Sequence, residues 1–525
     1  MSTQTTSPAA PPMDAQLRPG RSLALAAVLL AVFVVPMSIS GTAVALPGIG
    51  ADTHAGLVPL QWVVNGFNVA FACFTLAWGS VADIVGRVKA FAAGAAVYSV
   101  ASLASAVATN VLWLDAARAL AGIGGAAIFS CGSAILSTVF DGLARAKAFA
   151  LFGTVAGVGV AIGPSLAGAL VEGLGWRWVF AVHAVALILV LLAVPAIAKA
   201  MPADGGSGAR IDVLGSALFV IAMVLLTTAI VQGSQWGWSS AGDLGLFAGA
   251  FVVLAVFAVV ENRREHPMLD LSVLRNRRFV GLCLVPVAAS FGFVTMLTYL
   301  PSYLTAVTGR GTGAAGLIML LLTAPVLVCP MLAAKLVGRG ITPLALIYFS
   351  LACLVVGDLA LMLFSPDVKI LVVALPMLVT GAGMGLSAGL VDGQALELID
   401  PAKAGMAAGF LNTLRLGSEA VAVAVYGSTL ATALGNRIED GIGGHHGASH
   451  ADRVTDQAAG SDLTRATELS GATNAGAFTR FLAQSYDSAF HAVLWGLAAV
   501  CLVLCVVIAT LLRGSAADKR ALSHH

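Results

Sequence analysis

Long apolar runs alternate with short polar segments along almost the whole chain. The hydrocarbon core of a bilayer is about 30 Å thick, so a helix that spans it needs about 20 mostly apolar residues. Because lipid cannot satisfy backbone polar groups, each such run is predicted to be helical. Fourteen runs meet this requirement, near 22–46, 57–78, 90–109, 111–138, 146–170, 176–198, 212–232, 244–261, 279–303, 314–335, 341–363, 369–391, 403–433 and 488–512.

The first run also has features of a secretory signal peptide. Arg18 and Arg21 precede it, and the small residues Ala43–Ala45 lie near its end. Its apolar stretch is too long for a signal-peptide core, which favours a retained first helix.

The positions of Lys and Arg test the number of spans and give their orientation. With the N-terminus in the cytoplasm, most of these residues fall in cytoplasmic segments, and the short outer loops hold only Arg177, Arg310 and Lys369. A missed or invented span would reverse every later loop and remove this bias. We therefore expect a multi-pass protein of a bacterial inner membrane, embedded in the lipid bilayer, with both termini in the cytoplasm.

The polar segments outside the spans have distinct compositions. Residues 1–21, rich in Ser, Thr, Pro and Ala, are predicted to be a disordered N-terminus, and 514–525 a cytoplasmic tail. Residues 262–278 are predicted to form a basic cytoplasmic connector. The segment 434–487 is predicted to be a long, solvated outer loop.

Composition supports a membrane protein and excludes other classes. The chain is 59% hydrophobic and only 10% charged, whereas soluble chains carry about 25% charged residues. Its 58 glycines fit a helix bundle in lipid, where small residues let backbones approach closely. The net charge of +2 gives no indication of a nucleic-acid partner.

Metal sites and cofactors are not predicted. All cysteines lie in apolar stretches without zinc-like spacing and are interpreted as packing residues: Cys73, Cys131, Cys283, Cys329, Cys353, Cys501 and Cys505. In the outer loop, His445, His446 and His450 are candidate metal ligands. A solvated loop is the favoured interpretation, because no acid or cysteine completes the set.

The segment Gly79–Lys89 follows the second span. Gly79 allows close helix contact, and Asp83 is placed to attract the positive N-terminal end of another helix. Arg87 and Lys89 anchor the inner face. This segment resembles the cytoplasmic loop signature of the major facilitator superfamily, and that resemblance implies a latch between two halves of a transporter. The alternative is an ordinary charged turn.

The fourth span contains Asp115–Gly125, with Arg118 at its centre. An arginine inside a span costs at least about 2.5–3.5 kcal/mol, so it is expected to face a cavity or a partner, and Asp115 lies one turn away. The segment resembles the family's second signature, whose arginine is linked to proton coupling, although Ala121 replaces the usual glutamine. The alternative is an outer-end salt bridge without a transport role.

Glycines are spaced by four in the fifth span, and a proline should bend the helix there. This span resembles the family's antiporter signature, which marks exporters, although Ala167 stands where glycine is usual. The alternative is tight packing alone. The residues concerned are Gly153, Gly157, Gly159, Gly163, Pro164 and Gly168.

Further stretches resemble the fourteen-span drug:proton antiporter branch of the family: Gly175–Phe180, Gln232–Trp238, His266–Leu271, Arg275–Phe279 and Leu411–Arg415. The resemblance implies an all-α major facilitator fold of two six-helix halves plus two extra transmembrane helices, fourteen spans in all. Residues 22–198 would form the first half, 199–278 the extra spans and connector, and 279–513 the second half. Substrate would bind between the halves near the bilayer midplane.

The first span departs from this branch. An aspartate usually precedes Ala-Leu-Pro, but Ser38 occupies its position here and Ala43 replaces a common asparagine. Cation recognition and proton coupling are therefore in doubt. In the second half, the counterpart of the latch near Lys335–Arg339 lacks the acid.

A coupled exporter needs a group that gains and loses a proton, and burial of a carboxyl favours its neutral form. Glu419 is the leading candidate, one turn beyond Arg415 in span 13, with a structural ion pair to Arg415 as the alternative. Asp392 and Glu397 near the inner end of span 12, and Asp358 in span 11, are further candidates. Ser38, Asp358 and Asp392 are also candidate cavity residues. His183 is interpreted as a hydrogen-bonded core histidine.

The favoured function is export of small amphipathic organic compounds by proton antiport, with a small-molecule substrate and protons as partners. A monomer that is not an enzyme is expected. No GxxxxGK[ST] motif is present, which argues against an ATP-driven pump. The alternatives are dedicated export of one metabolite, acid or siderophore-like compound, and a non-transporting membrane sensor.

Overall fold

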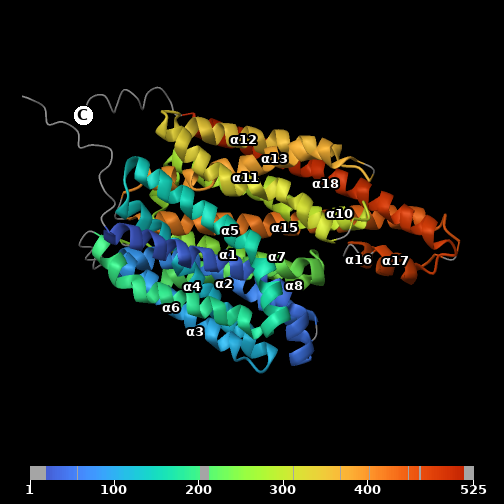
Figure 1. Cartoon of the computed structure of the whole chain (residues 1–525), viewed down its shortest axis with the longest axis horizontal. Coiled ribbons are helices and arrows are strands. Elements are labelled where there is room, and N and C mark those ends of the chain that lie inside the picture. The colour runs from blue at the N-terminus through green and yellow to red at the C-terminus, as the bar shows by residue number, and fades with distance from the viewer. Residues whose placement is uncertain are drawn as a thin grey trace, which may run out of the picture.

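The computed structural model describes residues 19–55, 57–201, 212–265, 267–310, 312–366, 368–400, 403–446, 448–459 and 463–513. These residues form an elongated helical bundle without β-strands (Figure 1). The predicted tail lies wholly, and the predicted disordered N-terminus largely, outside the described residues.

The first half consists of six helices that correspond to the first six predicted spans. Aromatic packing links three of them: Phe129 of the fourth helix lies edge-on to Phe71 and Phe152 of the second and fifth, with ring centroids 5.4 Å apart in each pair. Such pairs contribute about 0.5–1.5 kcal/mol beyond the burial of their area. The six helices are α1 (Pro19–Thr53), α2 (Leu57–Val85), α3 (Arg87–Ala106), α4 (Val111–Val139), α5 (Gly142–Leu174) and α6 (Arg177–Ala200).

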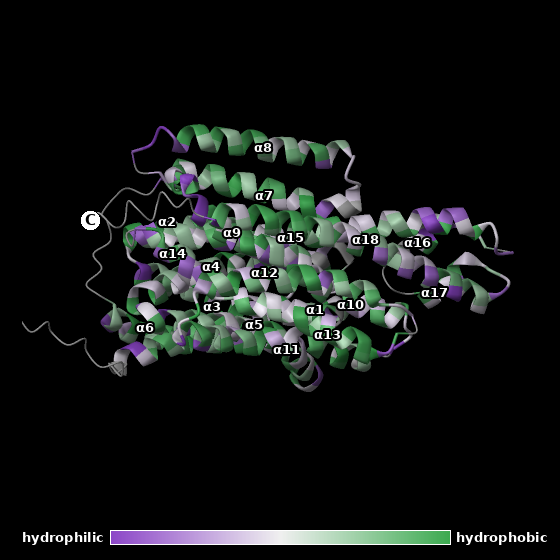
Figure 2. Ribbon diagram, turned by 90° about the horizontal axis from the view of Figure 1, so that it is seen from above, coloured by the Kyte–Doolittle hydropathy of each residue, from purple (hydrophilic) through white to green (hydrophobic). Residues whose placement is uncertain are grey.

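The two extra spans are α7 (Val213–Trp236) and α8 (Ala241–Glu261), which lie at one side of the bundle (Figure 2). Helix α7 packs against α2 and α15, whereas α8 packs mainly against α7. Large apolar side chains of α8, such as Phe251 and Val252, are exposed. In a bundle surrounded by lipid, this exposure is expected of a helix at the periphery.

The second half contains the other predicted spans. Its span at 279–303 is α9 (Arg277–Ala289), a π-helical turn η2 (Ser290–Val294) and α10 (Thr295–Ala306) in succession. The span at 369–391 is broken where Gly389 adopts a φ of +78°. The elements that follow α10 are α11 (Thr312–Gly338), α12 (Pro343–Ala360), η3 (Leu361–Leu363), α13 (Ile370–Ser387), α14 (Leu390–Glu397), α15 (Ala404–Ile442) and α18 (Ala475–Leu512).

Thirteen of the described helical segments are long and apolar enough to cross a membrane. The remaining predicted span, at 403–433, corresponds to α15, which lies alongside α2, α4, α9 and α18 but carries Arg415 and Glu419 among its apolar residues. Its length of about 58 Å exceeds the hydrocarbon core. An all-helical bundle with two six-helix halves and two extra helices is therefore confirmed, and the number of fourteen spans is consistent with it.

The two ends of the bundle differ. The start of α1 and the end of α18 share one buried cluster, which includes Ala24 and Leu512. We call this end, which also carries most of the basic residues, the basic end. The opposite end, called the far end, carries α16 (Ala451–Ala459) and α17 (Leu463–Ser470) (Figure 1).

The segment predicted as a long outer loop is largely helical. Helix α15 continues to Ile442, α16 and α17 follow, and α18 begins at Ala475. Buried apolar residues such as Val454 and Leu463 join these helices to the core of the second half. His445 packs against the rings of Phe478 and Phe481, and the described residues contain no cluster of three or more candidate metal ligands.

Candidate functional site

Asp83 joins the two halves at the basic end. Its Oδ1 accepts a hydrogen bond from the Gly405 amide at 3.0 Å, and its Oδ2 accepts one from the Met406 amide at 2.8 Å. These amides belong to the first turn of α15, whose donors have no partner within the helix and whose end carries positive charge. The carboxylate of α2 therefore caps a helix of the opposite half, as the sequence analysis expects.

Glycines let α2 and α15 approach closely beside this cap. A Cβ at Gly79 would collide with the Gly405 carbonyl, and one at Gly409 would lie 2.8 Å from the Thr75 carbonyl. Arg87 lies beside the cap, 3.4 Å from Asp83, and also donates to Thr138 of α4. Gly405 and Gly409 were missed in the sequence analysis, although their spacing of four was a usable signal.

A second contact holds the connector to the same end of α15. The Lys403 ammonium lies 2.6 Å from the Asp270 carboxylate. The ion pair with Lys403 and the hydrogen bonds from Ser272 lower the pKa of Asp270 to about 2. Asp270 therefore stays ionised at any physiological pH, and the pair weakens only as the pH falls from about 4 towards 2.

The pseudo-equivalent contact, between α11 of the second half and α5 of the first, is built differently. Helix α11 carries no acid, and its Gly338 lies against Leu143. The polar contact is an ion pair of 3.7 Å between Arg145 and Glu397 of α14. Both side chains line a cavity of about 510 Å³ that also borders Gln394. The sequence analysis did not anticipate this cavity.

The glycines of α5 face two different partners. Gly159 and Gly163 lie against α1, where a Cβ would come within 2.6 Å of the Phe33 carbonyl and 2.8 Å of the Met37 carbonyl, respectively. Gly153 and Gly157 face the second half, near Ala388 and Val326. Pro164 lies within α5 and is exposed. A Cβ at Gly168 would lie 3.9 Å from the Val44 side chain, so this position is less closely packed. Helix α5 is thus a close-packed element shared by both halves.

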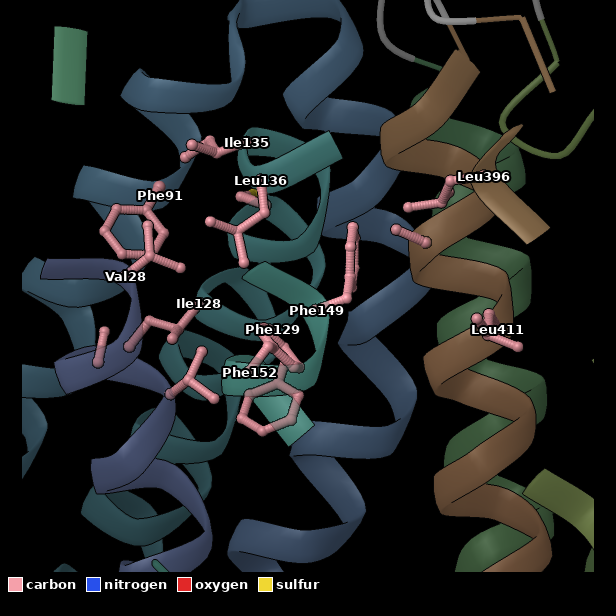
Figure 3. Close-up of a cluster of buried hydrophobic side chains, with 14 of the residues drawn as sticks. Val28, Phe91, Ile128, Phe129, Ile135, Leu136, Phe149, Phe152, Leu396 and Leu411 are labelled. Atoms are coloured by element: carbon pink, nitrogen blue, oxygen red, sulfur yellow. The ribbon is translucent and has the colours of Figure 1, made fainter. Parts of the chain in front are cut away.

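The break at Gly389 completes this contact. A Cβ there would collide with the Phe149 carbonyl of α5, and the φ of +78° is one that other residues rarely adopt. One buried apolar cluster continues across the interface, with Phe149 of the first half and Leu396 and Leu411 of the second (Figure 3). The halves are therefore closed against each other at the basic end.

Arg118 is 1% exposed and has only neutral partners among the described residues. Its Nε donates to the Val63 carbonyl at 3.1 Å and its Nη1 to Ser38 Oγ at 3.0 Å, while its guanidinium lies 4.4 Å from the Phe67 ring centroid. Asp115, expected as a partner, forms no ion pair with it: the Asp115 Oδ1 is buried without a hydrogen bond. Ser38, which occupies the position of the family's usual aspartate, is thus a direct hydrogen-bond partner of this arginine.

Arg415 differs because it is neutralised. Its Nη2 lies 2.8 Å from Asp392 Oδ2, and its Nη1 donates to Asn412. Glu419 therefore is not the ion-pair partner of Arg415. It has no hydrogen bond with the described residues and stays partly exposed, although α2, α4, α9, α10 and α18 pack around its helix.

The three candidate cavity residues are closed off in this conformation. Ser38, Asp358 and Asp392 are each less than 5% exposed. His183 is also buried, edge-on to Phe180, but its Nδ1 has no hydrogen-bond partner among the described residues. The hydrogen bond expected for this histidine is therefore not found at that atom.

Comparison with known proteins gives concordant matches. The sequence model of the Major Facilitator Superfamily matches residues 28–423. Multidrug resistance protein Stp of Mycobacterium tuberculosis is 29% identical over 79% of this chain and 77% of its own length. The probable actinorhodin transporter of Streptomyces coelicolor is 32% identical over 81% of this chain and 75% of its own length.

The fold is also found among solved structures. The crystal structure of the human organic anion transporter MFSD10 (TETRAN) covers 94% of this chain with all of its own length, at a TM-score of 0.61 and 14% identity. At that identity the likeness concerns the fold alone.

Proposed function

This chain belongs to the major facilitator superfamily, whose members are transporters rather than enzymes, and from that premise we propose that it exports small organic compounds by proton antiport. The names of its relatives, which include a multidrug resistance protein and a probable actinorhodin transporter, support drug-like substrates. The location is a bacterial inner membrane. The basic end would be cytoplasmic, because positively charged segments are retained on that side.

The position of Glu419 within the membrane is the observation on which this proposal rests. It is a carboxyl group about 22 Å along α15 from Ala404, deep in the hydrocarbon region. Ionisable residues at that depth are expensive and are functional sites by default. Because Arg415 is already neutralised by Asp392, Glu419 is free to bind and release a proton without disturbing that pair. Arg415 then serves to adjust the affinity of Glu419 for the proton.

The transport cycle follows from the contacts between the halves. Substrate would bind where α1, α4, α5, α9–α10, α13 and α15 meet. The state described here, closed at the basic end by Asp83, would alternate with one in which that end opens and α5 slides on its glycine contacts. Proton entry supplies the energy, of which the electrical part is about 2.3 kcal/mol per charge per 100 mV.

The test uses everted membrane vesicles that contain the full chain, with a pH-sensitive dye and ethidium as the first of a panel of probes. Addition of a transported probe to energised vesicles should release protons. Glu419→Gln should abolish this response while leaving expression and insertion intact. Glu439→Gln, an exposed position on the same helix, is the matched control. Normal proton release by Glu419→Gln would refute the role of Glu419, and no response to any probe would favour a sensor.

A second candidate function is dedicated export of one acidic compound. Arg118 favours it, because this buried cation forms no ion pair with an acid among the described residues and a substrate carboxylate is able to neutralise it. Ser38→Asp would place a carboxylate within reach of the guanidinium. If Arg118 binds anionic substrates, this change should lower transport of anionic probes by about tenfold or more and spare cationic ones, since a charge-assisted hydrogen bond is worth about 1.5–3 kcal/mol. Equal effects on both probe classes would contradict this alternative.

A further inference from the structure

Asp358 is a buried acid that the proposed cycle does not use. It is 4% exposed, and both carboxyl oxygens are buried; among the described residues, the Cys501 thiol is the weak donor that interacts with them. It lies about 22 Å along α12 from Pro343, within the membrane-spanning part of that helix. An ionised carboxylate in such a place, without a cation and with only a weak thiol donor, is strongly disfavoured. The site therefore holds the neutral, protonated acid.

The surroundings of Asp358 provide no counter-charge. Helix α12 packs against α13, α18, α9, α14, η2 and η3. Of these, α13, η2 and η3 have no titratable side chain, and on α18 the groups that interact with Asp358 are the thiols of Cys501 and Cys505. None of the charged side chains on the adjoining helices forms an ion pair with it among the described residues: Arg277, Arg278, Asp392, Glu397, Arg480, Asp487 and His491. Cys283 and Tyr486 are the other titratable groups on these helices.

The backbone that faces Asp358 is the π-helical turn η2. A Cβ at Gly292, inside this turn, would lie 2.6 Å from Asp358 Oδ2, so only glycine lets the carboxyl rest against the helix. At its first residue the turn bonds to α15, with Ser290 Oγ 2.9 Å from Ser418 Oγ. Ser418 directly precedes Glu419. Turns of this kind are rare and frequently mark functional sites, and this one lies between two membrane-embedded acids.

We propose that Asp358 is a second proton-binding site and that η2 couples its occupancy to Glu419. The inference rests on the proposed proton-coupled function. On release, the O–H bond of the Asp358 carboxyl breaks, the proton passes to water, and the electron pair stays on the carboxylate. The carboxylate then needs water or stronger donors than the Cys501 thiol, so η2 must shift. A shift of η2 moves Ser418 and the carboxyl beside it.

Dicyclohexylcarbodiimide tests this directly, because it is apolar and reacts with protonated carboxyl groups. The acid proton moves to a nitrogen of the reagent, and the carboxyl oxygen bonds to its central carbon; rearrangement then leaves a stable N-acylurea. The full chain in lipid vesicles is treated near neutral pH and mapped by mass spectrometry. Asp358 should be labelled. Asp392 is the internal control: it is equally buried but paired with Arg415, and should stay unlabelled.

Coupling is tested by labelling of Glu419 over a range of pH. Asp358→Asn keeps the shape of the side chain and removes its proton, so the pH midpoint of Glu419 labelling should shift. Gly292→Ala, which pushes on the carboxyl, should shift it as well, whereas Gly316→Ala on α11, where a Cβ meets nothing within 4 Å, should not. Labelling needs no substrate, so failure of the export proposal would leave these results intact.

Two outcomes would overturn the inference. One is an Asp358 that stays unlabelled while Glu419 reacts. The other is a Glu419 midpoint that is the same in wild type, Asp358→Asn and Gly292→Ala.

Discussion

The two halves of this protein place their buried acids in different locations. In the first half, Asp83 lies at the basic end and caps α15 of the other half. In the second half, Asp392, Glu419 and Asp358 lie further along their helices, and only Asp392 has a cationic partner. The buried arginines differ in the same way: Arg118 of the first half contacts neutral groups, whereas Arg415 of the second half is paired with an acid. This difference leads us to assign closure to an acid of the first half and proton binding to acids of the second.

The largest effect is expected from replacing Asp392, the acid of the second half that neutralises Arg415. Asp392→Asn leaves the Arg415 guanidinium without its acid in a mostly buried site. Breaking a buried pair in this way destabilises a protein by about 3–5 kcal/mol, so the midpoint of thermal unfolding of the purified protein in lipid should fall clearly.

Asp392→Asn combined with Arg415→Gln removes the unpaired charge and should recover much of that loss. An unchanged unfolding midpoint in the single variant would show that the pair is not what distinguishes Arg415 from Arg118.

A smaller effect is expected from the acid of the first half. Asp83→Asn retains the shape of the side chain but loses one of its two charge-assisted bonds to α15, worth about 1.5–3 kcal/mol. The population closed at the basic end should decrease by about tenfold or more relative to the open one, and turnover should slow. Crosslinking of introduced cysteines across the basic end measures this population.

Asp141→Asn is the control, because this acid is exposed at the same end and, among the described residues, pairs with Arg145 of the adjoining α5 rather than with the other half. Equal crosslinking and equal transport rates in Asp83→Asn and wild type would count against the latch.

The smallest effect concerns the glycine contact beside this cap. Gly409→Ala places a Cβ 2.8 Å from the Thr75 carbonyl and should separate α2 from α15. Overpacking of this kind costs about 1–3 kcal/mol, and the crosslinking assay should report a more open basic end. Gly417→Ala lies on the same helix, where a Cβ meets nothing, and should behave as wild type. If both variants crosslink alike, close approach of the two backbones is not needed for closure.

Much of the fold could be predicted from the sequence because lipid imposes one secondary structure on every apolar run. The sequence also predicted that Asp83 would lie near the positive N-terminal end of another helix. The partners of the buried arginines depend on long-range contacts: Asp115 is three residues from Arg118, but Ser38 of another helix contacts that arginine, and Asp392 of α14 pairs with Arg415. The helices within 434–487 were not predicted because their sequence is mostly polar. Their apolar residues, such as Val454 and Leu463, are buried by contacts with distant parts of the chain, which the sequence does not reveal.

The most direct test of this division of roles measures distances at both ends of the bundle by pulsed electron paramagnetic resonance in lipid. One pair of spin labels replaces the exposed Lys89 and Leu398 at the basic end, and another replaces Leu174 and Leu371 at the far end. We predict a short basic-end distance in wild type. Asp83→Asn should lengthen it and shorten the far-end distance, while Glu419→Gln should keep the wild-type distances and lose proton release. Distances at both ends that are unchanged by Asp83→Asn, or that lengthen together, would contradict the account.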